Sequence, residues 1–129
     1  INDDLRSSLL GLLEELTREG RRIDRVFVET TGVADPGPVV TTIILPEFSA
    51  RVHLDSVVTL VDAHAFNETE EEAIFKKQLQ EADLIVLNKC DLVSQPTIES
   101  LQERIESVPG VRADIVKATR GALPPETFF

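Results

Sequence analysis

Leu84-Ile85-Val86-Leu87-Asn88-Lys89-Cys90-Asp91 is the most informative stretch of the chain. Its four apolar residues run on without polar alternation, which is typical of a parallel strand that is covered on both faces. The polar residues that follow lie where such a strand must end. We therefore predict a buried strand over 84–87, with polar side chains grouped at its carboxyl end.

Three further segments are predicted to be strands, because they too are rich in Val, Ile, Leu or Phe. Apolar runs at 26–28 and 57–61 end at Glu29 and Asp62, and a weaker strand is expected over 113–117. In a parallel sheet the carboxyl ends of the strands meet at one edge, where ligands bind. Polar chemistry is therefore expected at that edge.

Four helices are predicted around these strands, three because their apolar residues recur at helical spacing and the short one from Pro38 because proline suits a first helical turn. They are 4–19 with Gly20 as the stop, Pro38–Leu45 stopped by Pro46, a helix opened by a capping box of Asn67 and Glu70 that presents Phe75, Leu79 and Ala82, and 98–108 closed by Pro109-Gly110. Apolar strands that alternate with such helices indicate right-handed βαβ crossovers. The predicted class is therefore α/β, with a mostly parallel sheet and flanking helices.

The composition and net charge of the chain argue against some classes of binding partner. The chain has 129 residues, which suggests one compact domain, and a formal net charge of −10. This acidic balance argues against binding a phosphate backbone, so no nucleic acid is expected as a partner. No apolar run approaches the length of a membrane span, so no membrane partner is expected either. Cys90 is the single cysteine, which favours a reducing, cytoplasmic location.

Asn88, Lys89 and Asp91 are predicted to bind a guanine base. A carboxylate at Asp91 can accept hydrogen bonds from N1–H and from the exocyclic amine of guanine, a pair that adenine does not offer. Asn88 can either join neighbouring loops or meet the purine edge, and the stem of Lys89 can lie along the base. The alternative is a polar turn in which Asp91 caps a helix.

Glu29-Thr30-Thr31-Gly32 follows another predicted strand. A carboxylate at Glu29 can hold a water of a magnesium shell or orient an attacking water. A glycine at position 32 lets its backbone approach a γ-phosphate closely. About two βα units, at roughly 30 residues each, separate Gly32 from Asn88, a spacing that suits a guanine nucleotide site. An ordinary tight turn is the alternative.

Weaker predictions concern three more places at the same edge. A backbone N–H in the loop at Ala118 and Thr119 can bond to guanine O6, although a plain loop is equally compatible with the sequence. Asp62 is a tentative magnesium-shell residue, with a turn or capping role as its alternative. His64 is a weak metal-ligand candidate, since two histidines without a spaced partner are more often surface residues.

Taken together, these motifs resemble the nucleotide-binding domain of the CobW family of P-loop GTPases. The resemblance rests on Val28 to Pro36, Val61-Asp62-Ala63, Ala82 to Leu92 and Ala118 to Gly121. It implies a three-layer P-loop fold, GTP or GDP with Mg²⁺ as cofactors, and a catalytic-water role for Glu29. It further implies γ-phosphate sensing by Gly32, guanine recognition by Asn88, Lys89 and Asp91, and a metal such as zinc or cobalt that is delivered to a client metalloprotein.

Two features of the family are absent from these 129 residues: the glycine-rich Walker A loop and the Cys-x-Cys-Cys metal motif. We therefore expect residues 1–129 to be a partial GTPase domain that has been excised from a longer protein. The first strand of that domain is expected to be missing from these residues. Negligible hydrolysis by this chain alone is expected. A missing central strand would leave open sheet edges, which makes a homodimer a hypothesis.

Two functions follow from the sequence. The first is a GTP-binding, GTP-hydrolysing metallochaperone of the CobW type. The alternative is a nucleotide-independent, acidic protein-interaction or metal-binding module on a degenerate GTPase scaffold. The Asn88 to Asp91 motif disfavours an ATP-using relative, and the Glu29 to Pro36 segment disfavours a nickel-chaperone relative.

Overall fold

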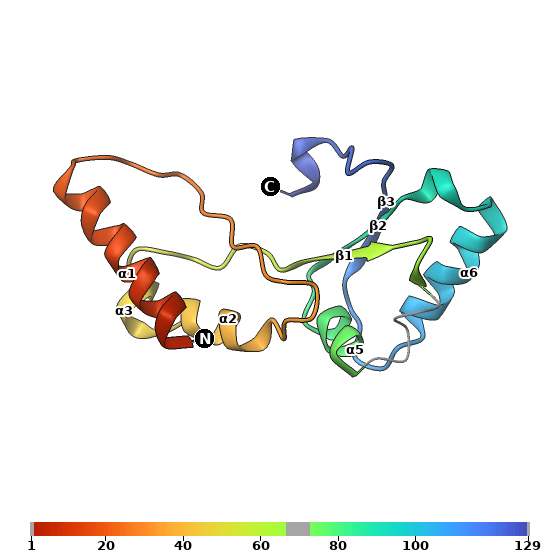
Figure 1. Cartoon of the computed structure of the whole chain (residues 1–129), viewed down its shortest axis with the longest axis horizontal. Coiled ribbons are helices and arrows are strands. Elements are labelled where there is room, and N and C mark those ends of the chain that lie inside the picture. The colour runs from red at the N-terminus through yellow and green to blue at the C-terminus, as the bar shows by residue number, and fades with distance from the viewer. Residues whose placement is uncertain (1, 67–72, 129) are drawn as a thin grey trace. The chain divides into compact units, whose positions relative to one another are not determined.

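The computed structural model describes residues 2–66 and 73–128. The chain forms two compact units, Ile1–Leu54 and Asp55–Phe129, and each is described by itself. Figure 1 shows the course of the chain through both of them. The predicted capping box of Asn67 and Glu70 lies outside the described residues.

The first unit holds three helices, α1 (Asn2–Arg18), α2 (Gly37–Ile43) and α3 (Pro46–Ser49). Helix α1 ends as predicted, because Gly20 takes a left-handed φ of 63°. The N–H of Arg21 then bonds to the carbonyl of Leu16, at 2.9 Å, and that of Gly20 to Thr17, at 3.2 Å. This is the hydrogen-bond pattern of a Schellman motif.

A small core joins these helices through the buried side chains of Leu9, Ile43 and Phe48. The prediction that Pro46 only stops a helix was incomplete. Helix α2 already ends at Ile43, and Pro46 opens the short α3. Proline is well suited to a first helical turn, because its missing N–H has no acceptor there.

The strand predicted over 26–28 was wrong. Val26, Phe27 and Val28 follow an irregular path, with exposed fractions of 43%, 78% and 41%. A strand requires a neighbouring backbone, and the ladders of the described residues join only the three strands of the second unit. Apolar and β-branched composition alone therefore did not produce a strand here.

The second unit is built on a parallel three-stranded sheet (Figure 1). Its strands are β1 (Val58–Asp62), β2 (Leu84–Asn88) and β3 (Asp114–Lys117), in the order β1-β2-β3. The register pairs Asp62 with Asn88 and Leu87 with Lys117. The carboxyl ends of all three strands therefore lie at one edge.

Both crossover helices, α5 (Ala73–Gln80) and α6 (Gln95–Glu106), contribute to one core with β1 and β2. Leu79, Ile85, Leu87 and Ile105 are fully buried in it. The opposite face of the sheet carries a second cluster of Leu84, Val86 and Ala118, with Leu123 and Phe128 packed against it. A mostly parallel sheet with flanking helices is thereby confirmed. No described helix is long and apolar enough to cross a membrane.

Candidate functional site

The candidate site begins at the carboxyl end of β1. Asp62 is its last residue, and its Oδ1 accepts hydrogen bonds from the N–H groups of His64, at 2.9 Å, and Ala65, at 3.1 Å. Its Oδ2 lies 2.5 Å from Nζ of Lys89. The hydrogen bond from Lys89 is the main reason that the pKa of Asp62 is lowered. Both carboxylate oxygens are thus engaged by the protein.

These contacts bear on the predicted magnesium role of Asp62. A ligand of a magnesium shell must offer an oxygen to the ion or to one of its waters. Here Oδ1 accepts from the turn and Oδ2 accepts from one ammonium group, which leaves Oδ2 a second lone pair, so the magnesium role of Asp62 stays a prediction. The alternative from the sequence, a turn role, is the one that the structure shows.

The guanine motif follows β2 directly. Lys89 has a left-handed φ of 61°, a conformation that costs a non-glycine residue on the order of 1–3 kcal/mol. It turns the chain into a short 3₁₀ helix, Cys90–Leu92. The half-buried thiol of Cys90 donates to the carbonyl of Leu87, at 3.1 Å. Asp91 is exposed in this turn and has no hydrogen bond or ion pair with any described residue.

Asn88 ties this motif to the loop after β3. Its Oδ1 accepts the N–H of Gly121 at 3.0 Å, which is the loop-joining arrangement considered from the sequence. The loop turns tightly, since Ala122 donates to the carbonyl of Thr119 and both central residues have positive φ, 54° at Arg120 and 67° at Gly121. Such a pair of φ values is characteristic of a type I′ turn.

Ala118 and Thr119 differ in what they can offer a ligand. The N–H of Ala118 donates to the carbonyl of Leu87 at 2.9 Å, and its carbonyl accepts from Cys90 at 3.1 Å. The N–H of Ala118 is therefore not free to donate to a guanine O6, contrary to the prediction. The N–H of Thr119 has no acceptor within the described part of the chain, and Thr119 is exposed.

Glu29 and Gly32 belong to the first unit and are described apart from the residues above. Both are exposed. Gly32 lies in a turn in which Ala34 donates to the carbonyl of Thr31, at 3.0 Å. Its φ is not in the left-handed region, and an added Cβ would meet nothing within 4 Å. The protein itself therefore gives no steric reason for a glycine at this position.

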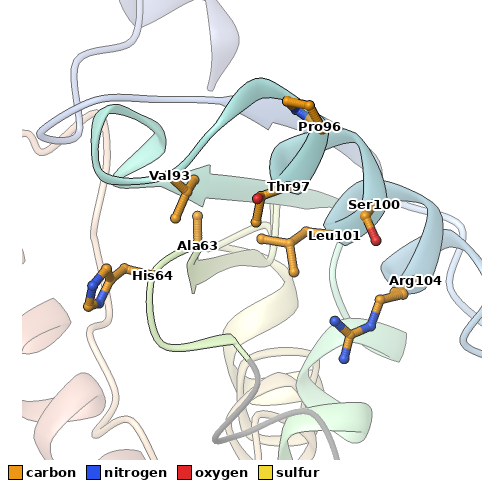
Figure 2. A pocket seen from close by; sticks show the side chains of 8 residues that line it. All are labelled: Ala63, His64, Val93, Pro96, Thr97, Ser100, Leu101 and Arg104. Atoms are coloured by element: carbon orange, nitrogen blue, oxygen red, sulfur yellow. The ribbon is translucent and has the colours of Figure 1, made fainter.

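His64 lies on the rim of an open hollow of about 430 Å³ between the loop after β1 and helix α6. Figure 2 shows its lining, with His64 and Arg104 at opposite ends and Thr97 and Leu101 from α6 between them. The Arg104 guanidinium carbon lies 4.9 Å from the ring centre of Phe66. Within the described ranges, no three His, Cys, Asp or Glu side chains gather as a metal site. Among the residues that the structure describes, no metal centre forms around His64.

Three features of the site could not be read from the sequence: the pairing of Asp62 with Lys89, the pairing of Asn88 with Gly121 in particular, and the type I′ turn. The first two join residues that are 27 and 33 positions apart. Only the Gly at position 121 hinted at the turn, since glycine favours positive φ.

Comparisons with known proteins indicate the family of the chain. The family model described as "CobW/HypB/UreG, nucleotide-binding domain" matches residues 2–116. The zinc chaperone YjiA of Escherichia coli is 36% identical over 99% of this chain and 40% of its own length. The zinc-regulated GTPase metalloprotein activator 1 of Schizosaccharomyces pombe is 33% identical over 86% of this chain and 28% of its own.

A solved structure supports the same relationship. The crystal structure of Zn(II)-bound YjiA GTPase from E. coli matches with a TM-score of 0.82 and 34% sequence identity. The match covers 94% of this chain and 38% of that one. The chain thus spans about two fifths or less of the relatives it matches.

Proposed function

The chain belongs to the CobW/HypB/UreG nucleotide-binding domain family, and from this premise we propose that it supplies the guanine-recognising part of a GTP-hydrolysing metallochaperone. The observation that carries the proposal is the edge formed by Asn88, Lys89 and Asp91 beside the turn at 119–122, held together by the bond from Gly121 to Asn88. This edge places one carboxylate and one backbone N–H, neither of which has a partner among the described residues, on loops that are tied to each other.

Guanine fits these groups. Asp91 would accept from N1–H and the exocyclic amine of the base, while the N–H of Thr119 would donate to O6. The aliphatic stem of Lys89 would lie along the ring. Adenine presents the opposite donor pattern at these positions, so the same arrangement selects against it.

Phosphate chemistry would be carried by the whole protein. We propose that Gly32 approaches the γ-phosphate and that Glu29 orients the attacking water or holds a water of a bound Mg²⁺. Support comes from the exposure of both residues and the open space at Gly32. A bound Mg²⁺ would neutralise charge that develops on the phosphates. Because the sequence contains no Walker A loop, we expect negligible hydrolysis by the 129-residue chain alone.

Zinc is the proposed cargo. The names of the relatives from E. coli and S. pombe refer to zinc, which favours zinc over cobalt for this protein as well. Cys90 is the only cysteine of the chain, so thiolate ligands for the metal would have to come from outside it. The nucleotide state would then control delivery to a client metalloprotein.

The test compares Asp91→Asn with the unchanged whole protein for GDP and XDP binding. An Asn side chain offers a donor where guanine needs an acceptor, so guanine affinity should fall by roughly tenfold or more while xanthine affinity rises, since one good bidentate pair is worth about 1–3 kcal/mol. Glu99→Gln on the exposed side of α6 is the charge-matched control. Unchanged base preference would remove the guanine assignment. Absence of binding by the unchanged whole protein would favour the nucleotide-independent acidic module instead.

A further inference from the structure

The pair formed by Asp62 and Lys89 is not used by the function proposed above. Asp62 is held at Oδ1 by two backbone N–H groups, and its Oδ2 therefore faces Lys89 in a fixed orientation. The two residues also lie on neighbouring strand ends, since the register places Asp62 beside Asn88. A carboxylate held by two backbone N–H groups thus lies directly beside the guanine motif.

This contact restrains the side chain of Lys89 at its terminal ammonium. A free lysine side chain has many rotamers, so holding it in one conformation costs entropy. Here its backbone is held at φ 61° and its terminal Nζ is held at Oδ2 of Asp62. Both ends of the aliphatic stem are therefore fixed, although the Lys89 side chain is 50% exposed to solvent.

We infer that Asp62 is a positioning residue for the purine nucleotide, because it anchors the ammonium of Lys89 and so orders the stem along which the base would lie. The inference rests on the proposed function. An ordered stem removes part of the entropy that nucleotide binding would otherwise cost. Since a methylene stem contacts any purine face alike, Asp62 should affect affinity without affecting the choice of base.

The first experiment measures GDP and XDP affinity in the whole protein carrying Asp62→Asn. Asparagine retains an oxygen for the turn at 63–65 but loses the charge that holds Lys89. Both affinities should fall by the same factor, roughly two- to tenfold, as expected for releasing one side chain. Asp114→Asn is the control, because it makes the same charge change in an exposed residue at the opposite end of the sheet.

A double substitution separates anchoring from a merely structural role. In a Lys89→Met background there is no ammonium to hold, so adding Asp62→Asn should leave GDP affinity unchanged. If it lowers affinity further by the same factor as in the native background, Asp62 acts independently of Lys89 and the inference is overturned. Tighter binding by Asp62→Asn alone would also overturn it, since Asp62 would then compete with the nucleotide.

An NMR measurement without nucleotide keeps this inference distinct from the proposed function. Relaxation of the Lys89 side-chain methylene groups should show restricted motion in the native protein and free motion in Asp62→Asn. Equal mobility in both proteins would overturn the anchor. If the native protein fails to bind GDP, the proposed function fails and the positioning role fails with it. Binding of GDP with no change in Asp62→Asn would overturn the positioning role alone.

Discussion

Asp62 is the ionisable residue whose titration reports most directly on the site. The hydrogen bond from Lys89 lowers its pKa most, burial opposes this, and the N–H groups of Ala65 and His64 lower it further. The pKa in the folded state lies below the ordinary value of 3.8. The pairing therefore contributes its full stability above that value, and the contribution is lost as pH falls through the folded-state pKa.

Replacing Lys89 by Met should raise the pKa of Asp62 towards 3.8, because the largest cause of the shift is removed. Carbon-13 NMR titration of the Asp62 carboxyl group measures this directly. The accompanying loss of stability near neutral pH should be small, since exposed pairs are worth at most about 1 kcal/mol. Identical titration of Asp62 in both proteins would show that the pair does not form in solution.

Two glycines allow a residue-scale contrast between folding and ligand binding. Gly121 has a φ of 67°, so Gly121→Ala should lower the free energy of unfolding by about 1–2 kcal/mol. Gly32 has an ordinary φ and open space at its Cβ position, so Gly32→Ala should change stability by no more than about 1 kcal/mol. Urea unfolding of the chain measures both.

The same Gly32→Ala variant of the whole protein tests the proposed phosphate contact. Affinity for a non-hydrolysable GTP analogue should fall while affinity for GDP stays the same, because only the γ-phosphate would meet the added methyl group. An equal effect on both nucleotides would place the contact elsewhere.

At the scale of elements, the sequence was a good guide wherever burial and periodicity agreed. The strand at Leu84–Asn88 was predictable because its apolar run is buried in the sheet. The strand at Val58–Asp62 was predictable from its apolar run, of which Val61 is buried and Leu60 exposed. The end of α1 was predictable because Gly20 can take a left-handed φ. The run at 26–28 has the same composition and formed no strand. The composition of a segment shows that its side chains could be buried. A strand also needs a neighbouring backbone with which to form hydrogen bonds.

The candidate site, too, was predictable from the sequence only in part. The sequence placed Asp62, Asn88 and Ala118 at one edge correctly, because strand ends in a parallel sheet coincide. It could not show that Lys89 would donate a hydrogen bond to Asp62, nor that the N–H of Ala118 would donate to the carbonyl of Leu87. Those contacts depend on register and on side-chain direction, which periodicity does not specify.

Strand β1 suggests a prediction about self-association. It forms an edge of the sheet among the described residues, and Leu60 in its centre is 66% exposed. Open apolar edges favour pairing with another chain. We expect the 129-residue chain to associate as its concentration rises, and Leu60→Lys to shift it towards monomer, as measured by light scattering after gel filtration.

Leu92→Lys is the matched control for that experiment, because Leu92 is 57% exposed but lies in the 3₁₀ turn and not in a strand. It should leave association unchanged. A native chain that is monomeric at all concentrations, or equal effects of the two substitutions, would contradict a role for the β1 edge.

For the molecule as a whole, the division into two units predicts uneven stability. The first unit encloses a cluster of three buried residues, Leu9, Ile43 and Phe48, whereas the second has a larger cluster on one face of its sheet and another on the opposite face. Since local opening follows the amount of buried apolar surface, amide hydrogens in α1 and α2 should exchange faster than those in β2.

Phe48→Ala tests whether the two units also open separately. Phe48 is fully buried in the first unit, and truncating such a side chain costs about 3–5 kcal/mol. That loss should accelerate exchange throughout α1 and α2 while protection of β2 is retained, and Leu79→Ala, fully buried in the second unit, should do the reverse. Hydrogen exchange followed by mass spectrometry resolves the two cases. Parallel loss of protection in both units after either substitution would show instead that the chain unfolds as one cooperative body, whose stability belongs to neither core alone.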